Sequence, residues 1–323
     1  MTASVIMLLG FMALYFQAAE VLGYRTFDIP VLTKVAPSLA AGTQLAIFTA
    51  LFFGFGVKMP VVPFHTWLPD AHVDAPTAGS VLLAGLLLKM GGYGLIRLAL
   101  PLASAATAAV PVMFVFAVVS IIYAAVVCMP QRDLKRLVAY SSVSHMGLVL
   151  LGVAAYSADR SNYVGLAGAV FQMFAHGLVT AVLFMMAGSI HHHAGTREIE
   201  QLGGIARKMP VSGTVLTYGA LASLGLPGLV SFPSELLVFF ATYNAFGLLV
   251  FLPLAGVVLT AGYYLWMLQR ALFGPFNANL KKVSDLSVHE AVPLGLLMFL
   301  IGLFGALPYL MLRFINFAAG GSG

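Results

Sequence analysis

Charged residues are scarce in this sequence. Asp, Glu, Lys and Arg make up 8% of its 323 residues, whereas a soluble domain carries about 25%. So few charges could not cover a surface that faces water, and 61% of the residues are hydrophobic. Apolar stretches long enough to cross a hydrocarbon layer of ~30 Å recur along the chain. The composition therefore excludes a soluble globular protein and predicts an all-α, polytopic transmembrane helix bundle.

Cysteine and cofactor motifs are lacking as well. Cys128 is the only cysteine, which excludes an internal disulfide and a thiolate metal site. There is no glycine-rich phosphate loop, no haem or iron–sulfur ligand set and no nucleophile elbow. The basic residues are scattered among short loops, unlike the basic patch of a nucleic-acid-binding protein. We therefore expect no cofactor, no bound metal and no nucleic-acid partner, and transport driven by an ion gradient or by a partner protein.

Nine segments are long and apolar enough to cross the membrane. They are residues 3–22, 40–59, 77–100, 108–129, 139–156, 163–190, 211–247, 251–270 and 289–315. No connecting segment is long enough for a soluble domain. We expect residues 1–317 to form one transmembrane domain and residues 318–323 to form a flexible C-terminal tail.

The distribution of Lys and Arg predicts the orientation, because positively charged loops are retained in the cytoplasm. The loops after the fourth, sixth and eighth spans hold nine basic residues: Arg132, Lys135, Arg136, Arg197, Arg207, Lys208, Arg270, Lys281 and Lys282. The opposite side holds five: Arg25, Lys34, Arg97, Arg160 and Arg313. This difference predicts a cytoplasmic N-terminus and a C-terminus outside.

One lysine lies where a charge is costly. Lys89 is close to the middle of the third span, where an ammonium costs on the order of 3 kcal/mol unless it is paired or hydrated. The alternative is that its side chain reaches an interface, but a stem of about 6 Å is short for that position. We interpret Lys89 as a buried ammonium that exchanges protons.

Two further ionisable residues lie beside predicted helix breaks. Lys58 ends the second span directly before Pro60 and Pro63, which remove backbone donors. Glu235 follows a run of glycines and prolines within 211–247, which is too long for one straight crossing. Discontinuous helices recur at ion-carrying sites of transporters. The alternatives are a lysine that anchors a helix end and a carboxylate that caps a half-helix.

The two broken spans are five apart, so they cross the membrane in opposite directions. Each carries an ionisable residue beside its break. This arrangement is expected of an inverted-topology repeat.

The spans also contain two histidines, His145 and His176. Histidine titrates near neutral pH and passes protons through either ring nitrogen, although a lone histidine in a span is as often a packing residue. With Lys89 and Glu235 they suggest a proton relay. We expect His191–His193 to lie in a solvated loop rather than to bind metal, and His65, His72, Asp70 and Asp74 to cap helices.

Several strings resemble the antiporter-like membrane subunits of respiratory complex I. They are VKMPVVPFHTWLPDAH (57–72), APTAGS (75–80), DLKRLVAYSSVSHMG (133–147) and QMFAHG (172–177). Glu235 matches the M type, called chain 4 in mitochondria, whereas the L and N types are expected to have lysine there. The resemblance covers essentially the whole chain.

The resemblance implies a proton-translocating subunit of NADH:quinone oxidoreductase without a redox centre of its own. Lys58 would serve the first half-channel, Lys89, His145 and His176 the central relay, and Glu235 the outlet. The implied partners are the other membrane-arm subunits (the L and N types and the small membrane subunits) and the lipid bilayer, in a bacterial inner membrane.

The sequence departs from this family in one respect. Such subunits are expected to have about fourteen spans, and this sequence starts where the sixth begins. We therefore expect a C-terminal portion lacking about the first five helices, with an incomplete first repeat. A separate chain could supply the missing helices, including the glutamate that pairs with Lys58. The alternatives are a subunit of a cation/proton antiporter or membrane-bound hydrogenase-type complex, and an inert fragment that only fills membrane volume.

Overall fold

The computed structural model describes residues 1–278, 280 and 283–318, with side chains up to residue 315. Within these residues the chain is helical, and its only β-bridge pairs Asp133 with Glu198. Residues 319–323 of the predicted flexible tail lie outside the described residues, and Ala318 ends a helix.

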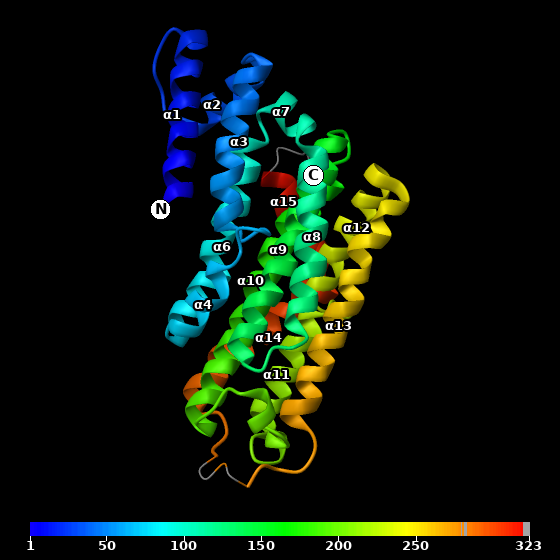
Figure 1. Cartoon of the computed structure of the whole chain (residues 1–323). Coiled ribbons are helices and arrows are strands. Elements are labelled where there is room, and N and C mark those ends of the chain that lie inside the picture. The colour runs from blue at the N-terminus through cyan, green and yellow to red at the C-terminus, as the bar shows by residue number, and fades with distance from the viewer. Residues whose placement is uncertain (279, 281–282, 319–323) are drawn as a thin grey trace.

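By length and composition, eight helical stretches of the described residues could cross a membrane, one fewer than the nine predicted, because residues 231–272 count as one stretch. Every predicted span nevertheless contains at least one of the main helices. They are α1 (Thr2–Leu22), α3 (Ala41–Lys58), the composite helix Thr77–Ala99, α8 (Val110–Cys128), α9 (Leu134–Ala158), α10 (Val164–Ala194), α11 (Pro210–Ser223), α12 (Ser231–Phe246), α13 (Phe251–Leu272) and α14 (Val288–Ala306). The shorter helices are α2 (Ile29–Val35), α4 (Trp67–Asp74), α7 (Ala103–Ala108) and α15 (Pro308–Ala318). Figure 1 shows α12 and α13 meeting in a turn at one end of the bundle.

The prediction of one span over 289–315 was wrong. The chain leaves the helical conformation at Leu307, and α15 starts at Pro308. A proline disfavours the α conformation of the residue before it, which explains the break.

Two transmembrane helices are discontinuous, as predicted. The first consists of α3 and α4, separated by a turn that contains Pro60 and Pro63. The second consists of α11 and α12, separated by residues 224–230, where Gly225 and Gly228 have positive φ angles of 77° and 92°. In Figure 1, α3 and α4 descend while α11 and α12 ascend, so the two broken helices run in opposite directions.

Helices α9 and α10 form the centre of the bundle. In α9, 94% of the most apolar stretch is buried, compared with 17% in α1. Helix α9 packs against α8, α10, α12 and α4, and α10 also contacts α11 and α14. Figure 1 shows α1 at the edge of the molecule. Polar side chains on α9 and α10 are therefore placed in the interior.

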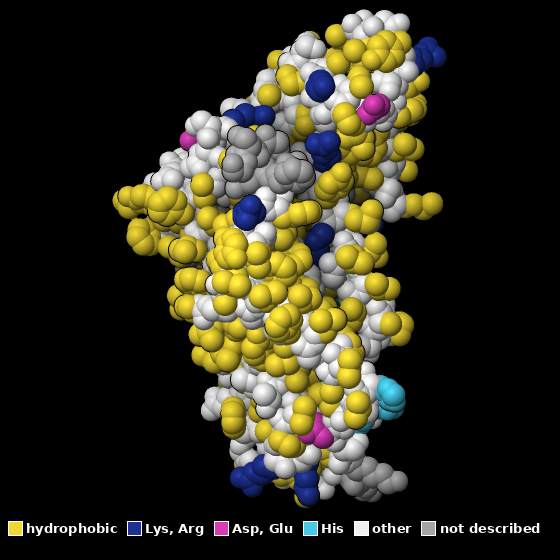
Figure 2. Space-filling model, turned by 180° about the vertical axis from the view of Figure 1, so that it is seen from behind, with side chains coloured by type: hydrophobic (Ala, Val, Ile, Leu, Met, Phe, Trp, Pro, Cys, Tyr) yellow, Lys and Arg dark blue, Asp and Glu magenta, His cyan; other side chains and the backbone are white. Residues whose placement is uncertain are grey.

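The outer surface suits a bilayer. Figure 2 shows a broad band of hydrophobic side chains between two groups of Lys and Arg. Exposed Leu, Val, Phe and Tyr side chains occur on most of the long helices. A helix bundle can place such residues in lipid, because its backbone polar groups are satisfied within each helix.

A carboxylate from a distant loop caps the half-helix α11. Asp285 accepts hydrogen bonds from the backbone amides of Val211 and Ser212 and from the hydroxyl of Ser212. These amides belong to the first turn of α11, whose N–H groups have no partner within the helix. Burial opposes ionisation of Asp285, but these hydrogen bonds and one from the amide of Leu286 hold its pKa below the usual value.

We predict that Asp285→Ala lowers the free energy of unfolding by about 1 kcal/mol, the usual cost of losing an N-cap. Because the pKa of Asp285 is lower in the folded state, its contribution should be present above the unfolded pKa of about 3.9 and lost as pH falls through the folded value. Thermal unfolding of the purified protein across this pH range tests both points. Asp28→Ala is the control, since Asp28 precedes α2 without a side-chain capping bond; an equal loss in both variants would contradict the prediction.

Candidate functional site

Lys89 donates into the protein instead of reaching an interface. Its Nζ atom lies 2.6 Å from Nδ1 of His176 and also bonds to the carbonyl oxygen of Ala84. Its short helical segment, α6 (Leu88–Gly94), lies between two π-helical segments, η2 (Leu83–Leu87) and η3 (Leu95–Ala99). Short π-helical segments occur often at functional sites. These two were not predicted from the sequence.

A groove of about 480 Å³ opens beside Lys89, lined mostly by apolar side chains of the composite helix and α10. It leaves the Lys89 side chain partly exposed. The ammonium is thus held at the boundary between this groove and the interior of the bundle.

Two histidines and a glutamate continue from Lys89 into the interior. The rings of His176 on α10 and His145 on α9 have centroids 5.4 Å apart. Nδ1 of His145 lies 3.7 Å from Oε1 of Glu235 on α12. The three residues are between 2% and 6% exposed. The structure therefore brings four of the five predicted site residues into one line across three central helices and the composite helix.

The carboxylate of Glu235 lies against the helix break. It belongs to the first part of α12, yet it makes no capping bond there, so the capping alternative was wrong. A Cβ atom on Gly225 would lie 2.6 Å from Oε2 of Glu235. Gly225 therefore serves two purposes: it adopts the positive φ of the turn, and it leaves room for the carboxylate.

A small cavity adjoins Glu235 and His145 on the side of α8 and α13. Its other lining residues include Ser144, Leu224 and Thr260. About 10 Å³ is open to the centre of a water-sized sphere, which corresponds to roughly one water molecule.

Four buried polar residues around His145 were missed from the sequence. Gln172 approaches Nδ1 of His145 with its Nε2 atom at 3.3 Å, and Ser234 donates to Oε1 of Gln172 at 2.5 Å. Ser223 lies 3.1 Å from Nε2 of His145 and contacts Tyr264. Gln172 could have been found, because it precedes His176 by four residues and so shares its helix face.

Lys58 does not join this cluster. It is the last residue of α3 and is exposed, and no hydrogen bond or ion pair with another described residue involves it. Its partner, if it has one, does not come from the described residues.

One prediction about histidines outside the cluster was wrong. His191–His193 lie in the last turn of α10 rather than in a loop, because this helix continues to Ala194. His193 contacts Glu290 at 2.9 Å and Ser284 at 2.7 Å, and so connects α10 to the start of α14. No group of three or more His, Cys, Asp or Glu among the described residues could hold a metal.

The predicted capping role of the residues around α4 was also wrong. The ring of His72 is fully buried and stacks on Phe184 with centroids 4.3 Å apart. Asp70 pairs with Arg136 at 2.8 Å. These contacts join α4 to α10 and α9, and neither residue caps a helix.

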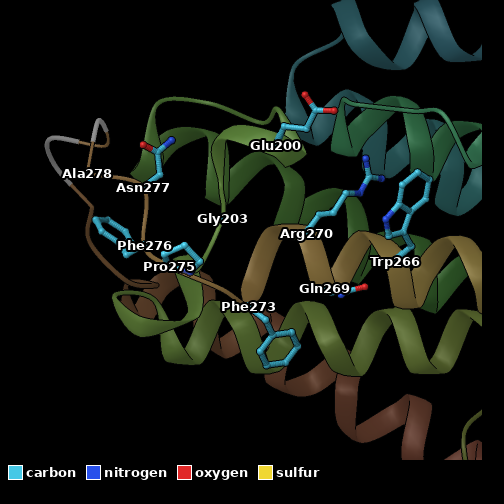
Figure 3. Close-up of a pocket in the computed structure, with 10 residues that line it drawn as sticks. All are labelled: Glu200, Gly203, Trp266, Gln269, Arg270, Phe273, Pro275, Phe276, Asn277 and Ala278. Atoms are coloured by element: carbon cyan, nitrogen blue, oxygen red, sulfur yellow. The ribbon is translucent and has the colours of Figure 1, made fainter.

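The largest of the described cavities lies elsewhere. It measures about 660 Å³ and is formed by the end of α13 and the loops beside it. In Figure 3, Arg270 lies beside Trp266, and the guanidinium carbon of Arg270 is 4.0 Å from the centroid of the Trp266 ring. This cavity shares no lining residue with the Lys89–Glu235 cluster, which therefore remains the candidate site.

The line from Lys89 to Glu235 thus runs through four helices, of which α12 is the second half of a broken helix. Residues 1–261 match the model of the "NADH:quinone oxidoreductase/Mrp antiporter, TM" family. The chain belongs to this family. The match covers both discontinuous helices and all four clustered residues.

Relatives in this antiporter family are M subunits of redox complexes. The chain is 43% identical over 95% of its length to F(420)H(2) dehydrogenase subunit M of Methanosarcina mazei, covering 61% of that protein. It is 38% identical over 94% of its length to NADH-quinone oxidoreductase subunit M of Rhodobacter capsulatus, covering 60% of it. The chain thus spans about three fifths of the length of these curated relatives.

Solved structures place the fold in the same family. A chain of respiratory complex I from Thermus thermophilus superposes with a TM-score of 0.85 at 30% identity, over 97% of this chain and 66% of that one. A chain of the Mrp complex from Dietzia superposes with a TM-score of 0.82 at 20% identity, over 96% of this chain and 64% of that one, a likeness of fold alone. The protein is therefore an integral membrane protein of the antiporter-like type.

We predict that Gly225→Ala displaces the Glu235 carboxylate, whereas Gly228→Ala does not. Both glycines have positive φ angles, so both changes strain the backbone by about 1 kcal/mol. Only Gly225 would place a Cβ atom against Glu235, because nothing lies within 4 Å of that position at Gly228. Infrared difference spectra of the carboxyl band, assigned with Glu235→Gln, check this. A shifted band in both variants, or in neither, would count against the packing role of Gly225.

Proposed function

We propose that this chain is an M-type subunit of a respiratory NADH:quinone oxidoreductase and translocates protons through Lys89, His176, His145 and Glu235. The observation that carries the proposal is the line of four ionisable side chains, from Nζ of Lys89 to the carboxylate of Glu235. In an apolar interior such groups are costly unless they are paired or hydrated, so a cluster of four indicates a function. Relatives of this chain suggest the reaction that drives transport, because they include an M subunit of NADH-quinone oxidoreductase.

The proton path follows the contacts. The ammonium of Lys89 gives a proton to Nδ1 of His176, which leaves an amine and an imidazolium. His176 passes a proton to His145, across a ring separation of 5.4 Å that requires a water or a ring rotation. His145 then protonates Oε1 of Glu235 from Nδ1, 3.7 Å away. Release from Glu235 toward the small cavity beside α8 and α13 completes one transfer.

Lys58 would act before Lys89 in this scheme. It ends the first half of a broken helix, as Glu235 begins the second half of the other. Its exposed side chain would pair with a carboxylate from transmembrane helices that pack against α3. We propose that these helices, the L-type and N-type subunits and the small membrane subunits are the partners of this chain.

The driving force in this scheme is remote electron transfer, and the chain itself holds no redox centre. We propose a bacterial inner membrane as its location, with the N-terminus in the cytoplasm and the C-terminus outside. The contacts of Arg197 with Asp133 and of Arg270 with the Gln131 carbonyl support this orientation, because they bring three basic segments together at one end of the bundle.

The alternative is a cation/proton antiporter or hydrogenase-type complex of the same family. The discriminating measurement is the identity of the proteins that co-purify with this chain. Quinone-reductase subunits support the proposal, and antiporter subunits alone would replace it with the alternative.

We predict that Lys89→Met reduces proton translocation by about 100-fold, the scale of losing a positioned proton-transfer group. The complex that contains the chain would be reconstituted in vesicles, and proton uptake would be followed with a pH-sensitive dye during quinone reduction. Lys34→Met is the control, since Lys34 is an exposed lysine in the last turn of α2. Undiminished translocation in Lys89→Met would reject the relay and leave a space-filling role.

A further inference from the structure

A chain of hydroxyl groups leads away from the second ring nitrogen of His145. Nε2 of His145 lies 3.1 Å from the hydroxyl of Ser223, which contacts the hydroxyl of Tyr264 at 2.9 Å. Tyr264 contacts the hydroxyl of Ser141 at 2.9 Å, and Ser141 donates to the carbonyl oxygen of Val138 at 2.8 Å. All three hydroxyl residues are buried, between 0% and 2% exposed.

The end of this chain sets the direction of every bond in it. A carbonyl oxygen only accepts, so the single proton of Ser141 goes to Val138. Ser141 must then accept from Tyr264, and Tyr264 in turn must accept from Ser223. With its only proton donated to Tyr264, Ser223 can only accept from His145. Any other assignment would place two oxygen lone pairs against each other in a dry site, where an unmade hydrogen bond is costly.

We infer that the chain Ser223–Tyr264–Ser141 holds neutral His145 in the tautomer with its proton on Nε2. The hydrogen bond at one ring nitrogen decides which tautomer is present. The unprotonated nitrogen is then Nδ1, the atom that faces Glu235 at 3.7 Å. Tyr264, Ser223 and Ser141 are therefore positioning residues: they orient the base of the proposed relay without touching the transferred proton.

The other side of the ring agrees with this tautomer. Gln172 contacts Nδ1 at 3.3 Å through its amide nitrogen, a donor that matches a lone pair. The amide oxygen of Gln172 accepts from Ser234 at 2.5 Å, which is shorter than the 2.8 Å from Ser234 to the Ser231 carbonyl. The two hydrogen-bond partners of the ring, Ser223 at Nε2 and Gln172 at Nδ1, thus specify the same tautomer.

The hydrogen-bonded hydroxyls of Ser223, Tyr264 and Ser141 fix one tautomer of His145 and do not conduct protons. We call these three residues the latch, in contrast to a proton wire. A wire needs a group at its end that can release a proton and take up another, and a backbone carbonyl cannot do so. The role of the latch rests on the proposed function, but the tautomer itself does not, so the two can fail separately.

The test is the tautomer of His145 in the purified complex. Solid-state nitrogen-15 spectra of histidine-labelled complex, after subtraction of the spectrum of His145→Gln, identify the unprotonated ring nitrogen. We expect Nδ1 in the native protein. Tyr264→Phe frees the proton of Ser223 to donate to Nε2, so the tautomer ratio should shift by about tenfold toward a proton on Nδ1. Proton translocation should fall with it.

The protein offers two control variants whose hydroxyl groups lie outside the Ser223–Tyr264–Ser141 chain. Thr242→Val removes a buried hydroxyl that donates to the Val238 carbonyl and lies outside this hydrogen-bonded chain, so it should leave the tautomer unchanged. Ser141→Ala should shift the tautomer although Ser141 does not touch His145, because Tyr264 is then free to donate to Ser223. Ser142→Ala should not, although Ser142 donates to the same carbonyl of Val138.

The outcomes separate the possibilities. An unprotonated Nε2 in the native protein, or a tautomer unchanged in both Tyr264→Phe and Ser141→Ala, would overturn the latch. Lost translocation in Tyr264→Phe with an unchanged tautomer would indicate a wire instead. A shifted tautomer in a complex whose translocation survives Lys89→Met would keep the latch and reject the relay.

Discussion

The cost of placing ionisable groups in an apolar interior governs this structure. Lys89, His176, His145 and Glu235 lie in the part of the bundle where water is scarce, and each is tolerated only through polar contacts to its neighbours. Those contacts require α9, α10, α12 and the composite helix to hold a fixed relation. The heavily buried α9 and α10 supply it, because they pack against most of the other helices and leave little freedom at the centre.

The helix breaks serve the same constraint. A continuous helix satisfies its own backbone and offers no room for a carboxylate beside its axis. At residues 224–230 the glycines take up positive φ angles, and Gly225 leaves the space that Oε2 of Glu235 occupies. The half-helix α11 that precedes this break is held from outside by Asp285 and ends at Ser223, beside His145. Backbone irregularity and the polar cluster are thus parts of one arrangement.

Some residues of the candidate site could be recognised from the sequence and others could not. Lys89 and Glu235 stood out, since a charge in an apolar run is conspicuous without any knowledge of contacts. Tyr264 and Ser223 did not, because hydroxyl residues are common in membrane helices and only a partner distinguishes them. The end of α10 was misjudged for a related reason. The polar residues His191–His193 suggested a loop, but His193 pairs with Glu290 on α14, which also bonds to Ser189 on α10.

By itself the sequence determined the class of protein, the two broken helices and the ionisable residues that the membrane must accommodate. These properties follow from the composition and from Pro and Gly, which act locally. Only the tertiary structure decided that Lys89, His176, His145 and Glu235 form one line, that Lys58 stands apart from it, and which nitrogen of His145 faces the carboxylate. Such relations depend on how helices far apart in the chain are rotated about their axes. No local pattern encodes that rotation, because nearly every face of these helices is apolar.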